Sequence, residues 1–196
     1  MSKSEENKIW VTLMERPWAK VNGNYIRIVC GRSPNEVFDI LTEAYSEEVA
    51  VKLSVKDSLL NILIDGEKKG FAMTTSTSGD DDVEDVGLSP RHAFTVLGIH
   101  EIKGEKVIRL RNPCGEGEFN GAWSDNSSKW TEELKKQYKY YEKEDGDFFM
   151  GYKDFMAYLV TMGFAKLHPK WSSTKLKVKK NWWNRMSTNQ SNYPKR

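Results

Sequence analysis

The stretch Pro90–Asp125, PRHAFTVLGIHEIKGEKVIRLRNPCGEGEFNGAWSD, is the part of the chain that decides the fold. Hydrophobic residues alternate with small or polar ones over 92–99 and again over 106–111, which is typical of half-buried strands. The Lys103-Gly104 pair between the two runs has turn chemistry. The stretch is therefore predicted to form a β-hairpin.

The two ends of this hairpin carry residues with catalytic potential. In an antiparallel pair the first residue of one strand lies near the last residue of the other, so His92 and Asn112 are expected at the same end of the ribbon. A side-chain amide can orient an imidazole that activates a thiol, and such a pair is half of a cysteine-protease site. The alternative is that both are polar residues at a strand end with no catalytic role.

The remaining sequence predicts helices and strands in a mixed order. A helix is expected over 8–21, with a kink or an end near Arg16 caused by Pro17. Ser33 as N-cap, Pro34 and Glu36 predict the start of a second helix. Further elements are expected at Tyr25–Val29 (strand), 56–67 (helix), 71–75 (strand), 76–87 (loop), Ser127 or Ser128 to Tyr141 (helix), the residues after the acidic turn KEDGD (strand), Tyr152–Thr161 (helix) and Trp171–Trp183 (exposed strand). The mixture indicates an α+β fold.

Composition excludes several classes of protein. The 196 residues include seven Trp and contain no apolar run of about twenty residues and no signal pattern, so a globular, cytoplasmic protein is expected. The two cysteines provide neither a disulfide framework nor a metal-binding spacing. The three histidines are too scattered in the sequence to indicate a zinc site.

Charge is distributed unevenly along the chain. Residues 166–196 contain nine Lys or Arg and no Asp or Glu, whereas residues 1–165 contain 21 basic and 28 acidic residues. Such a tail could bind nucleic acid or an anionic membrane. We expect a solvated strand face or a linker, with contact to anionic lipid as the alternative and no nucleic-acid partner.

Neither cysteine has the sequence context of a nucleophile. Cys30 ends a strand-like run and lacks a following Trp, and Cys114 follows Pro113 and opens no helix. The chain therefore offers a base and a group to orient it, but no convincing attacking atom.

Two acidic clusters follow the hairpin. Calcium takes about six to eight oxygen ligands, and two loops with carboxylates at alternate positions could provide them, although no EF-hand pattern is present. The alternative is a pair of solvated acidic turns. The clusters are Glu116, Glu118 and Asp125 in one loop, and Glu144, Asp145 and Asp147 in the other.

Five ordered motifs resemble the C-terminal half of the calpain protease core: HAFTV, IRLRNP, GEGEFNGAWSD, EDGDFFM and YKDFM. IWVTLMERPWAKVNGNY resembles the helix that opens that half, and WWNRMSTNQSNYP resembles the start of the following β-sandwich domain. The resemblance implies a papain-like subdomain with an antiparallel sheet flanked by helices. It divides the chain into a subdomain at 1–165 and a linker with the start of a truncated domain at 166–196. Both ends are expected to be cuts in a longer protein.

The resemblance also implies roles for individual residues. His92 would be the catalytic histidine and Asn112 the residue that orients it. A calcium site would use the side chains of Glu118, Asp125, Asp145 and Asp147 with the main-chain carbonyl of Lys143. The implied activity is calcium-dependent cleavage of protein or peptide substrates. The nucleophilic cysteine would belong to a partner, the N-terminal protease subdomain, so the isolated chain is expected to be inactive.

Three departures from the family pattern put activity in question. Cys114 stands where calpains typically have a Trp that shields the histidine–asparagine contact, and Arg91 stands where they typically have Gly. Asp147 replaces the usual Glu and shortens one calcium ligand. Arg91 and Cys114 motivate the alternative hypothesis, a non-catalytic calpain-like scaffold or calcium-sensing module.

Overall fold

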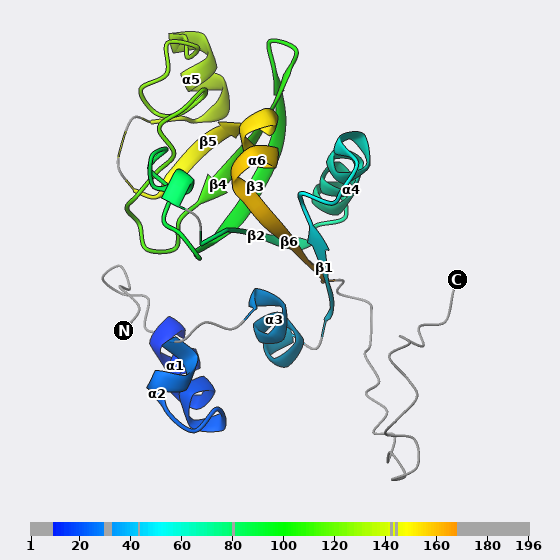
Figure 1. The fold of residues 1–196 in the computed structure, drawn as a ribbon, viewed down its shortest axis with the longest axis vertical. Helices are drawn as coiled ribbons and strands as arrows, with labels where there is room; N and C mark the ends of the chain where they lie inside the picture. The colour runs from blue at the N-terminus through cyan, green and yellow to red at the C-terminus, as the bar shows by residue number, and fades with distance from the viewer. Residues whose placement is uncertain are drawn as a thin grey trace.

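One antiparallel sheet organises the chain in the computed structural model, which describes residues 10–29, 33–42, 44–79, 81–141, 143 and 145–167. Six strands lie in the order β1-β6-β2-β3-β4-β5, and every neighbouring pair is antiparallel (Figure 1). The strands are β1 (Tyr45–Ala50), β2 (Ala72–Thr77), β3 (Ala93–Ile102), β4 (Glu105–Arg111), β5 (Asp147–Gly151) and β6 (Leu159–Lys166). The helices are α1 (Trp10–Val21), α2 (Tyr25–Val29), α3 (Pro34–Thr42), α4 (Lys56–Lys68), the 3-10 turn η1 (Asp81–Val83), α5 (Glu132–Tyr138) and α6 (Tyr152–Tyr158). This arrangement is the α+β fold that the sequence predicted.

The predicted hairpin is formed by β3 and β4. Ile102 pairs with Glu105, and the two residues between them have positive φ, +50° at Lys103 and +79° at Gly104. A two-residue turn with both φ values positive matches the twist of the flanking strands. The pairing of Thr95 with Arg111 at the other end fixes which residues meet beyond the ladder.

Alternation along β4 and β5 places side chains into two separate cores. Phe148 and Met150 point into the larger core, whereas Phe149 between them points into a smaller aromatic cluster on the opposite face. The larger core also receives Leu59 and Leu63 of α4 and lies under α6. The smaller cluster consists of Ile102, Val107, Trp123, Trp130, Tyr140 and Phe149.

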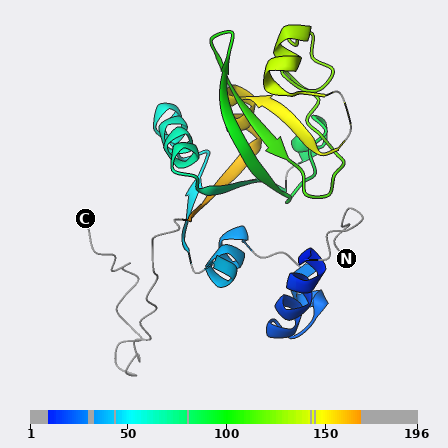
Figure 2. The same cartoon turned by 180° about the vertical axis from the view of Figure 1, so that it is seen from behind.

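The helices lie on different parts of the sheet. Helix α4 packs against β2 and β3, α6 against β4, β5 and β6, and α3 against β1 and β6. Figures 1 and 2 show α1, α2 and α3 at one end of the molecule and α5 at the other. The sheet between them carries the hairpin, so the hairpin ends lie at the edge of the packed core.

The predictions near the N-terminus have different outcomes. The helix predicted over 8–21 is α1, which does not end near Arg16 but continues through Pro17 to Val21, because the hydrogen bonding resumes after the proline, as Asn22 N–H to Trp18 O at 3.1 Å shows; the kink stays a prediction. The predicted strand Tyr25–Val29 is helix α2. Asn24 Oδ1 accepts the N–H of Arg27 at 3.0 Å, and this cap stabilises a helical turn over the β-branched residues.

The helix after the hairpin begins later than predicted. It starts at Glu132 and ends at Tyr138, rather than running from Ser127 or Ser128 to Tyr141. Thr131 is its N-cap and accepts the N–H of Leu134. The serines instead lie in turns that bury Trp130 before the helix can start.

The C-terminal part of the sheet was largely missed by sequence reasoning. The helix predicted over Tyr152–Thr161 stops at Tyr158, and β6 follows from Leu159. β6 has a nearly continuous apolar sequence because both of its faces are covered, so it has no period of two to identify it. β1 was not predicted at all. The strand predicted over Trp171–Trp183 lies outside the described residues, and the division at residue 165 stays a prediction.

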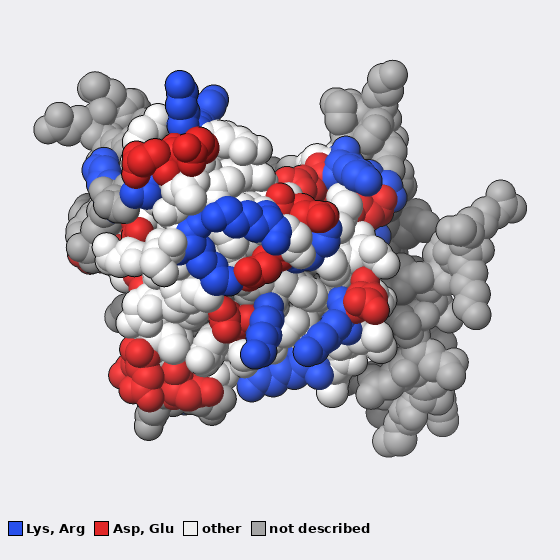
Figure 3. All heavy atoms as spheres, turned by 90° about the horizontal axis from the view of Figure 1, so that it is seen from above, with Lys and Arg blue, Asp and Glu red and all other residues white. Residues whose placement is uncertain are grey.

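The surface of the described part of the chain mixes both signs of charge. On the face seen from above, short stretches of Lys and Arg alternate with Asp and Glu (Figure 3). No described helix is both long and apolar enough to cross a bilayer.

Candidate functional site

The two hairpin ends bring His92 and Asn112 together. His92 precedes β3 by one residue and Asn112 follows β4 by one, and the distance from His92 Nε2 to Asn112 Oδ1 is 2.8 Å. Asn112 is 1% exposed. The predicted proximity of the two residues is therefore confirmed, while their catalytic role stays a prediction.

The hydrogen bonds of Asn112 determine which way its amide faces. Its Nδ2 lies 2.7 Å from the carbonyl of Glu116 and 3.0 Å from that of Gly117, and carbonyls can only accept. Its Oδ1 lies 2.9 Å from the N–H of Cys114, which can only donate. The amide oxygen therefore points at His92, and the opposite assignment would leave three groups unsatisfied.

This orientation fixes the tautomer of His92. Because Oδ1 can only accept, the proton of the neutral imidazole is on Nε2, and Nδ1 carries the free lone pair. An imidazole held in this tautomer can take a proton from a thiol at Nδ1, and the amide oxygen stabilises the imidazolium that forms.

Apart from the bond to Asn112, His92 is positioned mainly by hydrogen bonds of its main chain. The ring is partly buried and meets Phe94 edge-on, with centroids 5.0 Å apart at 87°. The His92 carbonyl accepts the N–H of Thr77 at 3.0 Å, and the His92 N–H donates to Thr77 Oγ1 at 3.0 Å. The end of β2 thus anchors the residue that precedes β3.

Cys114 lies beside the pair on its exposed side. Its Sγ is 4.0 Å from His92 Nε2, and its side chain is exposed. The small thiol leaves this side of the histidine–asparagine bond uncovered, and exposure to water weakens such a bond. Cys30, the other candidate nucleophile, lies outside the described residues.

The residue before His92 adopts an unusual backbone conformation. Arg91 has φ +49°, in the left-handed region that favours glycine. Its N–H donates to the carbonyl of Ser78 at 2.7 Å, and its side chain covers Gly79, where an added Cβ would lie 2.5 Å from Arg91 Nε. The conformation explains why a glycine suits this position.

Two residues of the first acidic cluster, Glu118 and Asp125, line an open pocket next to the hairpin end. Glu118, Asp125 and Lys143 line it together with Phe119, Asn120, Ser124 and Asn126. Glu118 Oε1 accepts the N–H groups of Asp145 (3.0 Å) and Gly146 (2.7 Å). Burial raises the pKa of Glu118, and burial together with the charge of Glu118 raises the pKa of Asp125 to about 7.

Two of the predicted calcium ligands have other partners. Asp147 accepts two hydrogen bonds from Arg109, at 2.9 and 2.6 Å, and does not line the pocket. Asp145 Oδ1 accepts the N–H of Asp147 at 3.1 Å, and its Oδ2 lies 4.0 Å from Lys143 Nζ. The described residues contain no group of three or more His, Cys, Asp or Glu arranged to hold a metal.

The pocket nevertheless has the chemistry of a hard-cation site. Glu118 and Asp125 bring carboxylate oxygens to it, and Asp125 Oδ1 is buried without a hydrogen-bond partner among the described residues. A bound cation offsets the repulsion between two neighbouring carboxylates and contacts carboxylate oxygens that lack a hydrogen bond. Glu118 and Asp125 fit calcium, whereas Asp147 would first have to leave Arg109.

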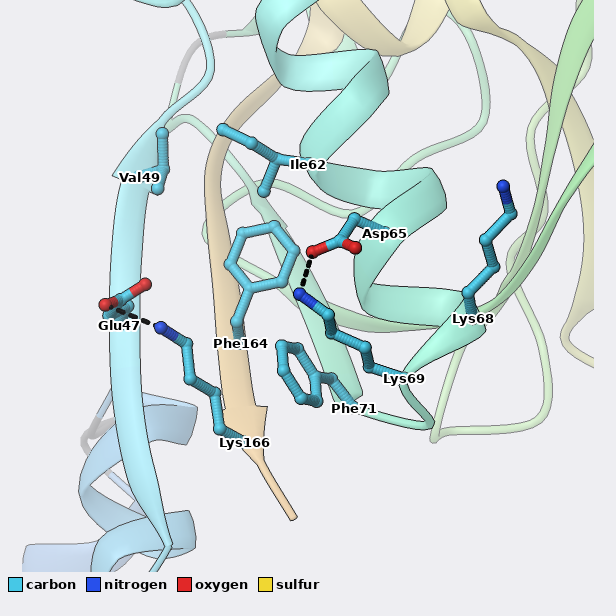
Figure 4. Close-up of a pocket in the computed structure, with 9 residues that line it drawn as sticks. All are labelled: Glu47, Val49, Ile62, Asp65, Lys68, Lys69, Phe71, Phe164 and Lys166. Carbon is cyan, nitrogen blue, oxygen red and sulfur yellow. Dashed lines mark hydrogen bonds and ion pairs between the residues drawn. The ribbon is translucent and has the colours of Figure 1, made fainter. Parts of the chain in front are cut away.

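A second hollow lies at the other end of the sheet, between β1, α4 and β6. Figure 4 shows Phe71 and Phe164 in its floor and two ion pairs at its rim, Lys69–Asp65 and Lys166–Glu47. Its lining contains no His, Cys, Ser or Thr. It therefore offers none of the thiol, hydroxyl or imidazole groups of a cysteine- or serine-protease site, and the His92 end of the hairpin stays the candidate site.

Sequence reasoning missed two residues that build this site. Gly146 accepts the main-chain N–H of Asn112 at 2.7 Å and has φ +83°. The Asp145-Gly146 dipeptide predicted a turn at this position, but it did not predict that the turn would bond to Asn112. Thr77, which contacts His92, had no signal in the sequence because its partner is 15 residues away.

Known proteins are similar to this chain in sequence. Residues 1–166 match the family described as calpain family cysteine protease. The calpain-1 catalytic subunit of Macaca fascicularis is 32% identical over 94% of this chain and 28% of its own length, and calpain-8 of Rattus norvegicus is 34% identical over 86% and 25%. The calpain-type cysteine protease ADL1 of Oryza sativa subsp. japonica is 29% identical over 84% and 8%. The chain thus spans about a quarter or less of the length of these relatives.

Proposed function

Because the chain belongs to the calpain family of cysteine proteases, we propose that it forms the half of a calpain-type endopeptidase core that supplies the catalytic histidine and asparagine. The observation that carries this proposal is the bond of 2.8 Å between His92 Nε2 and Asn112 Oδ1, with the asparagine amide locked by three main-chain groups. The arrangement is preorganised before any partner binds, as catalytic pairs require.

In the proposed reaction, His92 Nδ1 takes the proton of a cysteine thiol contributed by a partner subdomain. The thiolate attacks the carbonyl carbon of a peptide bond, and the imidazolium returns the proton to the departing amine nitrogen. Water then cleaves the thioester with the same histidine as base. Asn112 Oδ1 holds the ring in one tautomer and stabilises its charged form throughout.

We further propose that activity depends on calcium bound between Glu118 and Asp125, with the Lys143 carbonyl and Asp145 nearby. When bound, calcium supplies positive charge that offsets the two partly buried carboxylates. Glu118 also accepts the N–H of Gly146, whose carbonyl holds Asn112. The pocket is thereby linked to the catalytic pair through one glycine.

A chimera tests the proposal. Residues 1–166 replace the matching segment of the calpain-1 catalytic subunit, and cleavage of a fluorogenic peptide is measured with calcium and with a chelator. We expect calcium-dependent cleavage by the chimera and none by the isolated chain. His92→Ala should abolish cleavage, because the thiol then has no base.

Two results would argue against the assignment. Cleavage by a His92→Ala chimera would mean that another residue is the base. Cleavage by the isolated chain that Cys114→Ser abolishes would place the nucleophile within this chain. Circular dichroism and a thermal melt establish that each variant is folded before its activity is compared.

The left-handed conformation of Arg91 and the exposed thiol of Cys114 favour a second candidate function, a non-catalytic calpain-like module. In that case a folded chimera would bind calcium without cleaving peptide. Restoring the family residues, Arg91→Gly with Cys114→Trp, would then restore cleavage. Cleavage by the double variant would mean that the module has lost its activity through these two residues, whereas no cleavage would mean that the catalytic assignment is wrong.

A further inference from the structure

The two members of the catalytic pair are held in different ways. Asn112 has a hydrogen bond at its main-chain N–H and three more main-chain partners at its side chain. The ring of His92 has the bond to Asn112, the edge-on contact with Phe94 and the thiol of Cys114 at 4.0 Å. The position of the imidazole therefore depends on where its main chain is fixed.

The main chain of His92 is fixed at the end of β2. The β2–β3 ladder pairs Ser76 with Ala93, so Thr77 lies opposite His92, one residue beyond the ladder. Thr77 N–H donates to the His92 carbonyl at 3.0 Å in the ordinary way. The His92 N–H, however, donates to the hydroxyl of Thr77 at 3.0 Å instead of to a main-chain carbonyl.

The same hydroxyl also restrains the segment before the histidine. Thr77 Oγ1 donates to the carbonyl of Ser89 at 2.7 Å. Between Ser89 and His92 the chain passes through Arg91 at φ +49°, a conformation that L residues with side chains rarely adopt and that the surroundings must hold. Thr77 is 4% exposed, so water cannot readily replace its hydroxyl.

We propose that Thr77 is a positioning residue for His92, whose hydroxyl fixes the histidine main chain so that the ring reaches Asn112. The inference rests on the proposed function for its catalytic meaning, but its structural claim stands on these contacts. Thr77→Val removes the hydroxyl while keeping the branched shape. His92 then loses its N–H acceptor, and Ser89 loses its donor.

The chain contains a matched control on the same strand. Thr75 lies two residues earlier, on the same face of β2, and is 2% exposed. Its hydroxyl donates to the carbonyl of Thr161 in β6 at 2.8 Å and does not contact the histidine segment. Thr75→Val therefore removes a comparable buried hydroxyl without affecting His92.

Hydrogen exchange measured by NMR on this chain tests the inference. The measured quantities are the exchange rates of the main-chain N–H of His92 and of its ring Nε2–H. Each rate is divided by the exchange rate of core amides in the same variant, which corrects for changes in global stability. Thr77→Val should accelerate both by about tenfold, whereas Thr77→Ser and Thr75→Val should change them by less than about threefold. Unchanged His92 exchange in Thr77→Val, or equal acceleration in Thr75→Val, would overturn the proposal.

The chimera adds a readout that a general loss of stability would not give. With Thr77→Val, kcat should fall about tenfold at an unchanged KM, because substrate binding is intact while the base is less often in place. Thr77→Ser should restore kcat. Failure of the proposed function would appear separately, as a folded chimera with native Thr77 that does not cleave, and the exchange result would still decide the role of Thr77.

Discussion

The corner formed by His92 and Asn112 and the acidic pocket beside it satisfy their polar groups in opposite ways. In the corner, both polar atoms of the Asn112 side chain have partners from this chain. In the pocket, Asp125 Oδ1 is buried without a hydrogen-bond partner in the part of the chain that the structure describes, and the Glu118 charge contributes to raising the pKa of Asp125. The chain thus completes the hydrogen bonding of the Asn112 side chain by itself, but the pocket is suited to a cation from outside.

Removing Asn112 should produce the largest effect. Asn112→Ala removes a buried amide that bonds the N–H of Cys114 and the carbonyls of Glu116 and Gly117. The free energy of unfolding should fall by about 3 kcal/mol, as measured by urea denaturation. In the chimera kcat should fall by about a hundredfold or more, because the imidazole loses its orientation.

Asn61→Ala is the matched control for this variant. Asn61 is an exposed asparagine of α4, so its loss should leave unfolding and kcat close to those of the unmodified protein. A loss of stability in Asn112→Ala no greater than in Asn61→Ala would mean that the corner is not preorganised.

Gly146→Ala should have the next largest effect, because Gly146 belongs to both regions. Its carbonyl holds Asn112 and its N–H holds Glu118. An added Cβ would lie 2.6 Å from the Asn112 carbonyl and 2.9 Å from Gly115 Cα, at φ +83°. Thermal unfolding should show a loss of about 2–3 kcal/mol.

Gly70→Ala separates the two causes of that loss. Gly70 has φ +70° with nothing within 4 Å of an added Cβ, so it measures the backbone term alone, about 1 kcal/mol. Equal losses of unfolding free energy at the two glycines would show that the close contacts of Gly146 with Asn112 and Gly115 do not contribute to the effect.

The same contrast shows what the sequence can predict. The hairpin and the meeting of His92 with Asn112 depend on local alternation and a two-residue turn, so they could be read directly. β1 and β6 could not, because β6 is apolar on both faces and β1 is recognised only through its pairing with β6. The Tyr25–Val29 segment has β-branched residues, yet one asparagine cap makes it helical.

Non-local register explains why the Arg109–Asp147 ion pair was not predicted. Asp147 was expected among the calcium ligands, but β4–β5 pairing places it opposite Arg111, with Arg109 two residues further along the same strand. Side chains at such diagonal positions reach one another, and Arg109 takes both carboxylate oxygens. A register between strands 38 residues apart cannot be read from either strand alone.

Asp125→Asn should have a smaller effect of opposite sign. At pH 8 the carboxylate is ionised although its folded pKa is about 7, so its charge destabilises the fold in the absence of metal. In chelator the variant should be more stable than the unmodified chain by about 1 kcal/mol, after allowance for solvent screening. Calcium should raise the melting temperature of the unmodified chain and raise that of the variant much less.

Asp85→Asn is the control for the loss of one acidic charge. Asp85 is exposed and does not line the pocket. If Asp85→Asn changes the calcium response as much as Asp125→Asn, the response reflects net charge and not the pocket.

The smallest effect is expected at Glu105, whose carboxylate is already paired with a lysine of the same chain. Lys129 Nζ lies 2.6 Å from both of its oxygens, and Trp123 Nε1 donates at 3.0 Å, so Lys129 first and Trp123 second hold the pKa of Glu105 below its usual value. A lowered folded pKa means that the stabilisation is present above the unfolded pKa and is lost as the pH falls. Glu105→Gln should therefore flatten the decline in stability between about pH 5 and pH 3, by about 0.5 kcal/mol at this exposed position.

Salt and calcium then distinguish the two kinds of carboxylate. Sodium chloride at about 0.5 M should reduce the Glu105 effect, because exposed ion pairs are screened. Calcium should leave the effect unchanged, since Lys129 already supplies the positive charge, whereas it should act strongly at Asp125. If Glu105→Gln reduced the calcium response as much as Asp125→Asn does, the comparison would fail. The carboxylate paired within the chain and the pocket suited to an added cation would then behave alike.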